Sequence, residues 1–130
     1  MAATEVTGRW PVEEIPDAGR LFMRVHHQWL DPEGLPAPGA FEDHEGSMST
    51  DWEKYSTPQD TLQRALTLAR RGVVLMTAGD VREIPNLRVT HTPAPQNQAH
   101  TDVLGEKSAE VRMKLSRICT WAIPIPPLSA

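Results

Sequence analysis

Cysteine is almost absent from this chain of 130 residues, which contains only Cys119. A single cysteine excludes an internal disulfide and a zinc site built from several thiolates. Cys119 follows the apolar Ile118 inside a predicted helix, so we expect its thiol to be buried and unreactive.

Long apolar runs and a strong excess of one charge are also missing. No apolar run approaches the roughly 18 residues that span a membrane, and the first residues lack a basic-then-apolar leader. We therefore expect no membrane association and a cytoplasmic location. The formal net charge of −4 argues against a surface that follows a nucleic-acid backbone, so nucleic acid is not an expected partner.

Small aromatic residues are few, whereas proline is abundant. Two Phe and one Tyr stand against 12 Pro, and four Trp supply most of the aromatic bulk. The prolines fall mainly in residues 11–58 and 93–127, which predicts long irregular connections around one compact centre. We expect an N-terminal arm over residues 1–19, one domain over 20–122 and a proline-rich tail over 123–130.

Residues 86–122 form the stretch around which we expect the fold to assemble. Its first part alternates apolar residues, Leu87 and Val89, with polar ones, which is the pattern of a half-buried strand. A proline-broken loop and a second extended segment follow. If these two strands pair, His91 and His100 flank one loop and lie near each other.

A tight turn at Gly105 leads into the last predicted helix. Ser108 provides a typical N-cap for this helix. Its apolar face consists of four residues: Val111, Leu115, Ile118 and Ala122.

Three further strands complete the predicted sheet: Arg20–Leu30, Ser47–Trp52 and Val73–Thr77. Thr57 caps a helix that we expect to run to Arg71, and Asp80 caps a short helical turn. The order predicts an α+β fold, a single domain whose mixed or antiparallel sheet of four to five strands is backed by two helices. The predicted core includes Leu66, Val74, Leu75, Leu115 and Ile118.

The five histidines suggest a metal site as one interpretation; they are His26, His27, His44, His91 and His100. Such a site would combine His26, His91 and His100 with Asp102 or Glu106. His26 and His27 point to opposite faces of a strand, so at most one of them can contribute. We favour a structural role in which His91 and His100 bond the proline loop and fix its path, and we expect no metal.

Residues 47–51 hold two serines, a threonine and an aspartate, and His44 lies nearby in the sequence. This composition is compatible with acyl or phosphoryl chemistry, although such residues near turns usually act as caps. The sequence has no nucleophile elbow, Walker loop or dinucleotide fingerprint. Residues 105–108 share a glycine and a lysine with phosphate loops, but we interpret them as the start of an ordinary capped helix.

The segment Asn97-Gln98-Ala99-His100, followed by Gly105-Glu106-Lys107, resembles a pattern in small uncharacterised bacterial proteins. These proteins share an Asn-x-Ala-His segment before a glycine–lysine turn and a closing helix. The likeness covers most of residues 20–122. It implies the organisation of the domain and no particular activity.

A second pattern is similar to that of ADP-ribosyltransferases. These enzymes carry an Arg or His for NAD on the first strand, a Ser-x-Ser/Thr on the second and a Glu on a later strand. The matching positions in this sequence are Arg24 or His26, Ser47-Met48-Ser49, and Glu106. The resemblance implies NAD as a substrate.

We predict from the sequence a small non-catalytic binding or accessory subunit of a bacterial multi-protein assembly, with a protein partner and no cofactor. The reasons are the lack of a complete catalytic constellation, the long proline-rich segments and Trp residues expected to be exposed at segment ends. The alternative is an enzyme with a histidine-based site. Its candidate catalytic residues are His26, His91 and His100 with a metal, or Arg24 in an NAD-using transferase.

Overall fold

Six strands form one sheet in the order β4-β5-β2-β1-β3-β6, and every neighbouring pair is antiparallel. The computed structural model describes residues 10–41, 47–65 and 70–127. The strands are β1 (Arg20–His26), β2 (Ser47–Trp52), β3 (Arg71–Thr77), β4 (Arg88–His91), β5 (His100–Leu104) and β6 (Thr120–Ile123). The helices are α2 (Pro58–Gln63), α3 (Ala78–Arg82) and α4 (Ala109–Ile118), with 3-10 turns η1 (His27–Trp29) and η2 (Pro38–Phe41).

The α+β prediction is confirmed, but the sheet has six strands rather than four to five, and three α-helices rather than two accompany it in the described residues. The extra strand, β6, lies where we expected the last helix to continue to Ala122. The backbone of Cys119 is extended (φ −95°, ψ 155°) and ends α4. Residues 120–123 then pair with β3, because the edge of that buried strand would otherwise leave backbone groups unpaired.

The second predicted helix is also shorter than expected. Thr57 forms a capping box with Asp60, as its sequence suggested, but α2 ends at Gln63 and Arg64 is its C-cap. Arg71 belongs to β3, so the predicted extension to Arg71 is wrong. Leu66, a predicted core residue, lies outside the described residues.

The start of α3 differs from the prediction in its cap. Thr77, the last residue of β3, accepts a hydrogen bond from the backbone N–H of Asp80 and is the N-cap. Asp80 lies in the first turn, where its negative charge suits the positive end of the helix dipole.

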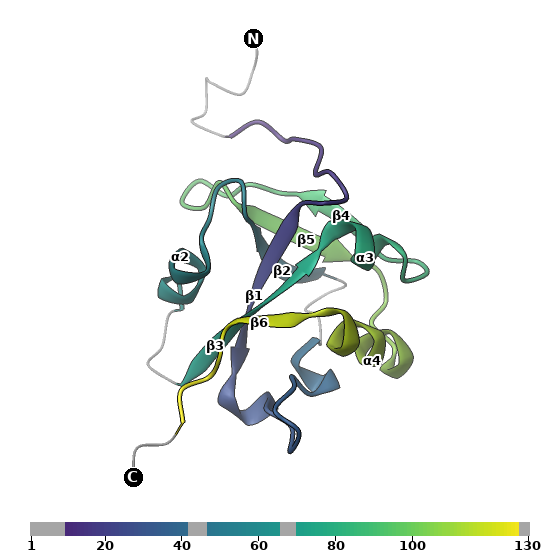
Figure 1. Ribbon diagram of the computed structural model, residues 1–130. Helices are drawn as coiled ribbons and strands as arrows, with labels where there is room; N and C mark the ends of the chain where they lie inside the picture. The colour runs from purple at the N-terminus through teal and green to yellow at the C-terminus, as the bar shows by residue number, and fades with distance from the viewer. Residues whose placement is uncertain (1–9, 42–46, 66–69, 128–130) are drawn as a thin grey trace.

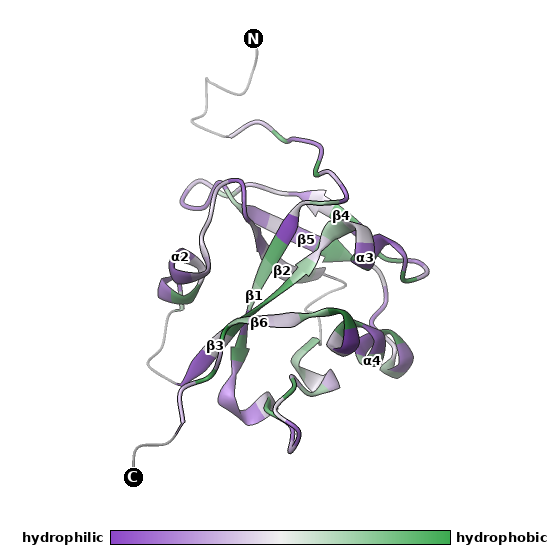
Figure 2. Cartoon of the chain, in the orientation of Figure 1, coloured by the Kyte–Doolittle hydropathy of each residue, from purple (hydrophilic) through white to green (hydrophobic). Residues whose placement is uncertain are grey.

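The two faces of the sheet differ in composition. One face, here called the core face, carries apolar side chains and is covered by α3 and α4; its buried members include Leu21, Met23, Val25, Met48, Trp52, Val74, Met76 and Val103. The other face, here called the pocket face, carries Arg24, Ser47, Ser49, Asp51, His100 and Asp102, and α2 lies on that side (Figure 1). Figure 2 shows the apolar residues concentrated along β1 and β3 and polar residues on α2.

The predicted core is partly confirmed. Val74 and Leu115 are fully buried, whereas Leu75 and Ile118 are only half-buried. Cys119 is buried as expected but sits at the C-cap of α4 rather than inside the helix. Burial raises the pKa of its thiol to about 11, so little reactive thiolate forms near neutral pH.

The N-terminal segment is fastened to the domain from Glu13 onward. Ile15 is buried in the core, and its carbonyl accepts a hydrogen bond from Arg82. The carboxylate of Glu13 meets the Lys54 ammonium at 2.6 Å and also accepts from the Tyr55 hydroxyl. The hydrogen bond from Lys54 and, to a smaller extent, the one from Tyr55 lower the pKa of Glu13.

None of the helices in the described ranges has both the length and the apolar character needed to cross a membrane.

Candidate functional site

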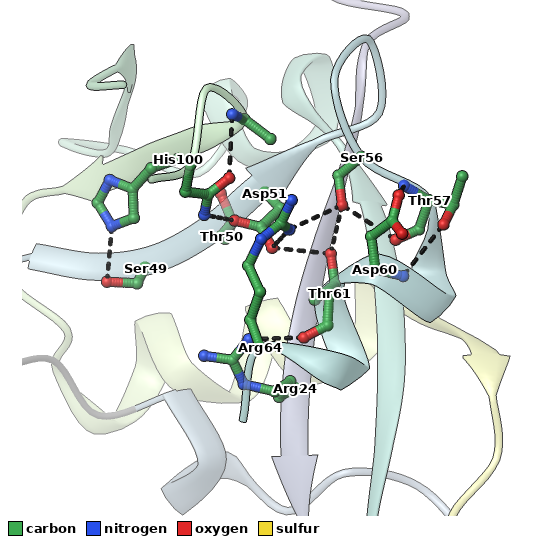
Figure 3. A network of polar contacts seen from close by, with 12 residues as sticks. Arg24, Ser49, Thr50, Asp51, Ser56, Thr57, Asp60, Thr61, Arg64 and His100 are labelled. Atoms are coloured by element: carbon green, nitrogen blue, oxygen red, sulfur yellow. Dashed lines mark hydrogen bonds and ion pairs between the residues drawn. The ribbon is translucent and has the colours of Figure 1, made fainter. Parts of the chain in front are cut away.

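A polar pocket of about 320 Å³ opens on the pocket face, between the sheet, α2 and the loop before β5. Its size is at the lower end of the range for small-molecule sites. The lining residues are Phe22, Met23, Arg24, Ser49, Thr50, Asp51, Thr61, Arg64, Asn97 and His100. Figure 3 shows how the polar members come together from β1, β2, α2 and β5.

Asp51 is the structural centre of this pocket. It is only 5% exposed, and one oxygen, Oδ2, accepts hydrogen bonds from Thr61 at 2.8 Å and from Arg64 at 2.7 Å. The other oxygen, Oδ1, accepts from the side-chain amide of Asn97 at 2.8 Å. Both carboxylate oxygens are therefore used to join β2, α2 and the loop before β5.

Two guanidinium groups line the pocket around this centre. Arg24 donates from Nη1 to the carbonyl oxygen of Thr61 at 2.7 Å, and Arg64 uses Nη1 for both Asp51 and Ser56. Their Nε and Nη2 atoms have no hydrogen-bond partner within the part of the chain that the structure describes. Both groups thus retain donors for a ligand.

The charge of Arg24 is held in a partly dry environment. Burial lowers the pKa of its guanidinium from the ordinary value, while the nearby carboxylate of Asp51 acts in the opposite direction. A guanidinium remains protonated at neutral pH in either case. Partial desolvation makes its attraction for an anion stronger than that of a fully hydrated surface arginine.

His100 and Ser49 form a contact at the other side of the pocket. The ring atom Nδ1 of His100 lies 3.0 Å from the carbonyl oxygen of Thr92, and Nε2 lies 3.3 Å from Ser49 Oγ (Figure 3). Nδ1 also lies 3.0 Å from Thr92 Oγ1, and Nε2 lies 4.0 Å from the Asp102 carboxylate. The Thr92 carbonyl oxygen can only accept, so its contact is a hydrogen bond in the tautomer that carries the proton on Nδ1. Nε2 is then an acceptor, and the Ser49 hydroxyl donates to it.

The strand pairing explains why these residues meet. Polar residues alternate along β2 with the residues of the core face, and β2 pairs with β5 in the register Ser49↔Asp102 and Asp51↔His100. Diagonal neighbours across an antiparallel pair are within reach of longer side chains. On the pocket face two residues of β2 have such diagonal partners, Ser47 with Asp102 and Ser49 with His100, whereas Asp51 reaches Asn97 in the loop before β5.

His91 does not belong to this site. It pairs with Thr101 in β5, one residue beyond His100, so the two histidines point to opposite faces of the sheet. The two residues flank one loop on paired strands, as predicted, but their side chains do not share a site. The prediction that both bond the loop is confirmed, since His91 Nε2 contacts the carbonyl oxygen of Gln98 at 2.8 Å and His100 contacts that of Thr92.

The surroundings of His91 are those of a core residue. Its side chain is 2% exposed, and its ring lies against Trp52 and Tyr55 with centroids 5.2 and 6.2 Å away. Nδ1 accepts from the backbone N–H of Glu13 at 3.0 Å. The ring therefore has both nitrogens engaged by the backbone.

His26 lies apart from His91 and His100, the two other histidines of the alternative metal site. His26 is the last residue of β1, five residues beyond Leu21. Leu21 pairs with Trp52, whose ring contacts His91, so Leu21 is at the end of β1 nearest His91. That separation is roughly 16 Å along an extended strand. The rings of His26 and His27 lie against each other, with centroids 4.3 Å apart, because the chain leaves the strand at η1. The prediction that these two side chains point to opposite faces of a strand is therefore wrong.

The arrangement required by the alternative metal interpretation is not formed. His26, His91 and His100 are dispersed, and no group of three potential His, Cys, Asp or Glu ligands occurs among residues 10–41, 47–65 and 70–127. His44 lies outside those ranges. Lys107, the lysine of the phosphate-loop-like segment, is buried and donates to the carbonyl oxygens of Val103 and Gly105.

Comparison of the chain with protein-family models, with curated proteins and with solved structures finds no match in any of the three. The geometry of the pocket is therefore the basis for assigning a function.

Sequence reasoning selected Arg24 and His100 but missed the residues that hold the pocket together. Asp51 was noted only as one polar residue of the 47–51 segment and Asn97 only as part of the Asn-x-Ala-His segment, whereas Thr61 and Arg64 were not considered. One signal was present: in Ser47–Trp52 every second residue is Ser or Asp, and Met48 and Trp52 lie between. That period predicts a strand with one polar face on which partners should be sought.

Proposed function

We propose that the protein is a small binding module that holds an anionic group, a carboxylate or a phosphate, in the pocket on the pocket face. The observation that supports this most directly is the pair of guanidinium groups of Arg24 and Arg64. Both line the pocket, and both are fixed through one nitrogen while other donors remain for a ligand. Planar guanidinium groups match carboxylate and phosphate oxygens in geometry as well as in charge.

The charge balance of the pocket agrees with this proposal. Among the described lining residues the charges are two guanidinium groups and one carboxylate, which gives +2 − 1 = +1 with His100 neutral. Asp51 is the carboxylate, and its oxygens are occupied by Thr61, Arg64 and Asn97. An incoming anion therefore meets attraction from Arg24 and little repulsion from Asp51.

The wider role follows the prediction from the sequence. An accessory subunit of a bacterial assembly would use this pocket for an acidic side chain or a terminal carboxylate of a protein partner. The Trp residues, which we expected to be exposed at segment ends, do not support this role. Trp52 is 4% exposed, and Trp29 and Trp121 are half-buried, which leaves Trp10 at 41%.

The experiment is a thermal-melting series with sodium phosphate and sodium succinate at constant ionic strength. Both anions should raise the melting temperature of the wild-type chain, because a ligand that binds only the folded state stabilises it. Arg24→Gln should remove most of that shift. Arg20→Gln is the matched control, since Arg20 lies on β1 outside the pocket lining and near Glu53.

An equal shift in all three proteins would contradict the proposal. Phosphate also stabilises proteins through exclusion from their surface, and that contribution is the same in the two arginine variants. Only the difference between Arg24→Gln and Arg20→Gln reports the pocket.

A second function, the predicted enzyme with a histidine-based site, is favoured by the contact between Ser49 and His100. The NAD-using form has less support. Arg24 and Ser49 line the same pocket, but Glu106 follows β5 and is not among its lining residues.

A further inference from the structure

The Ser49 hydroxyl has the hydrogen-bond arrangement of an activated nucleophile. Its oxygen lies 3.3 Å from His100 Nε2, and the hydroxyl donates to that nitrogen in the tautomer with the proton on Nδ1. Nδ1 is held by the carbonyl oxygen and the Oγ1 of Thr92, each at 3.0 Å. A nucleophile, a base and a third group that orients the base are the three parts of such a site. The Ser49–His100 distance is long for a hydrogen bond, as catalytic contacts often are before substrate binds.

Exposure supports the same interpretation. Ser49 is exposed although its strand is internal to the sheet, and the His100 side chain is 29% exposed. A substrate can therefore reach Ser49 Oγ from the pocket. Ser47, by contrast, donates its hydroxyl to the Asp102 carboxylate at 2.5 Å and does not line the pocket.

We propose that Ser49 and His100 are a catalytic dyad that hydrolyses esters carrying an anionic group. This inference rests on the proposed binding of an anion in the same pocket. Arg24 holds the anionic group, and the positive charge of the two guanidinium groups stabilises the negative charge that develops on the ester carbonyl oxygen.

The reaction proceeds through an acyl-serine. The Oγ electron pair of Ser49 forms a bond to the carbonyl carbon, and the hydroxyl proton passes to His100 Nε2. The tetrahedral intermediate collapses, the bond to the alcohol oxygen breaks, and the imidazolium returns its proton to the leaving alkoxide. Water then attacks the acyl carbon, its proton passes to the same Nε2, and the carboxylic acid leaves as Ser49 takes the proton back.

The test compares 4-nitrophenyl hemisuccinate, which is anionic, with 4-nitrophenyl butyrate, a neutral ester of equal acyl length. The wild-type chain should release nitrophenolate and carry a succinyl group on Ser49 in a peptide map. His100→Asn should slow the release by about 10² to 10⁴-fold, the usual contribution of a general base. Ser49→Ala should remove both the release and the label.

Two further variants separate binding from chemistry. Arg24→Gln should slow hydrolysis of the hemisuccinate by about tenfold or more beyond its effect on the butyrate, the loss expected for one charged hydrogen bond. Ser47→Ala, on the same strand and face, should hydrolyse both esters at the wild-type rate. If melting curves show that His100→Asn does not fold, His100→Gln replaces it. If Ser49→Ala does not fold, Ser49→Cys replaces it, and acylation at position 49 is then measured directly.

Release that is equally fast in the wild-type chain and Ser49→Ala, or a label on lysines alone, overturns the catalytic inference. If succinate nevertheless raises the melting temperature of the wild-type chain and not of Arg24→Gln, the binding function stands without the chemistry. If the melting shift is missing as well, both proposals fail.

Discussion

His91 and His100 flank one loop and each bonds its backbone, but they serve opposite faces of the sheet. On the core face, His91 has both ring nitrogens occupied by backbone groups of Glu13 and Gln98. On the pocket face, His100 uses Nδ1 for the Thr92 backbone and leaves Nε2 for a side-chain hydroxyl beside a cavity. What separates a structural histidine from a candidate base in this fold is therefore the partner of the second ring nitrogen.

The two faces as a whole repeat this difference. The core face excludes water with large apolar side chains, and its polar residues are enclosed. The pocket face keeps polar groups around a cavity, and Asp51 is buried there with both oxygens joining β2, α2 and the loop before β5. We therefore expect substitutions on the core face to change stability, and substitutions on the pocket face, except at Asp51, to change ligand binding.

The largest effect is expected from the helix that covers the core face. Leu115→Ala should lower the free energy of unfolding by about 2–5 kcal/mol, because Leu115 is fully buried and its truncation leaves a cavity. Met113→Ala, at a residue of α4 that is 45% exposed, is the control and should change stability little. Chemical denaturation measures both. Equal losses would mean that α4 does not pack on the sheet through Leu115.

A substitution at Asp51 should change stability, unlike the other substitutions on the pocket face. Asp51→Ala should cost about 1–3 kcal/mol of unfolding free energy, since the buried Thr61 hydroxyl and the half-buried Asn97 amide lose their carboxylate acceptor. Asp102→Ala is the matched control on the same face, because Asp102 is half-buried and accepts from Ser47. If Asp102→Ala is the more harmful of the two in urea denaturation, Asp51 is not the structural centre.

The two histidines should separate in stability. His91→Gln should lower the free energy of unfolding by about 1–2 kcal/mol, because His91 is buried and the Glu13 amide and Gln98 carbonyl lose well-placed partners. His100→Gln should cost less than about 1 kcal/mol, since its contacts are partly exposed. Thermal melting of the two variants side by side checks this order, and the reverse order would contradict the division between the faces.

The smallest effect concerns the pH dependence of stability and the N-terminal segment at Glu13. The pKa of Glu13 is lowered by its hydrogen bonds to Lys54 and then Tyr55, so its contribution to stability is complete above the pKa of the unfolded chain. That contribution disappears as pH falls through the lower pKa of the folded chain. Glu13→Gln should therefore melt below the wild-type chain at pH 7, and the gap should close toward pH 3. A gap that widens on acidification would reverse the assigned sign.

The strands were the part of the fold most accessible to prediction. Ser47–Trp52 was identified with its observed bounds. β1 lies within the predicted Arg20–Leu30, and the predicted Val73–Thr77 lies within β3; both were located from their apolar pattern. β6 was missed because Thr120–Ile123 follows a helix without a turn signal, and only the open edge of β3 specifies it. Local pattern cannot show which edge a four-residue segment will meet.

The candidate site was harder to predict because register decides it. Arg24 and His100 were selected as individual residues, but their grouping with Ser49 and Asp51 depends on Asp51 pairing with His100. A shift of one residue would have sent His100 to the core face and His91 to the pocket. Arg64 and Asn97 enter the site through a helix end and a loop, whose positions follow from tertiary packing.

The most direct test of the division between the two faces is an NMR spectrum of the imidazole nitrogens during addition of sodium succinate. The ring resonances of His100 should move with succinate concentration, and those of His91 should stay in place, because only His100 lines the pocket. Arg24→Gln should abolish the movement. Resonances of His91 that move as far as those of His100, or a His100 signal unaffected by succinate, would contradict the account.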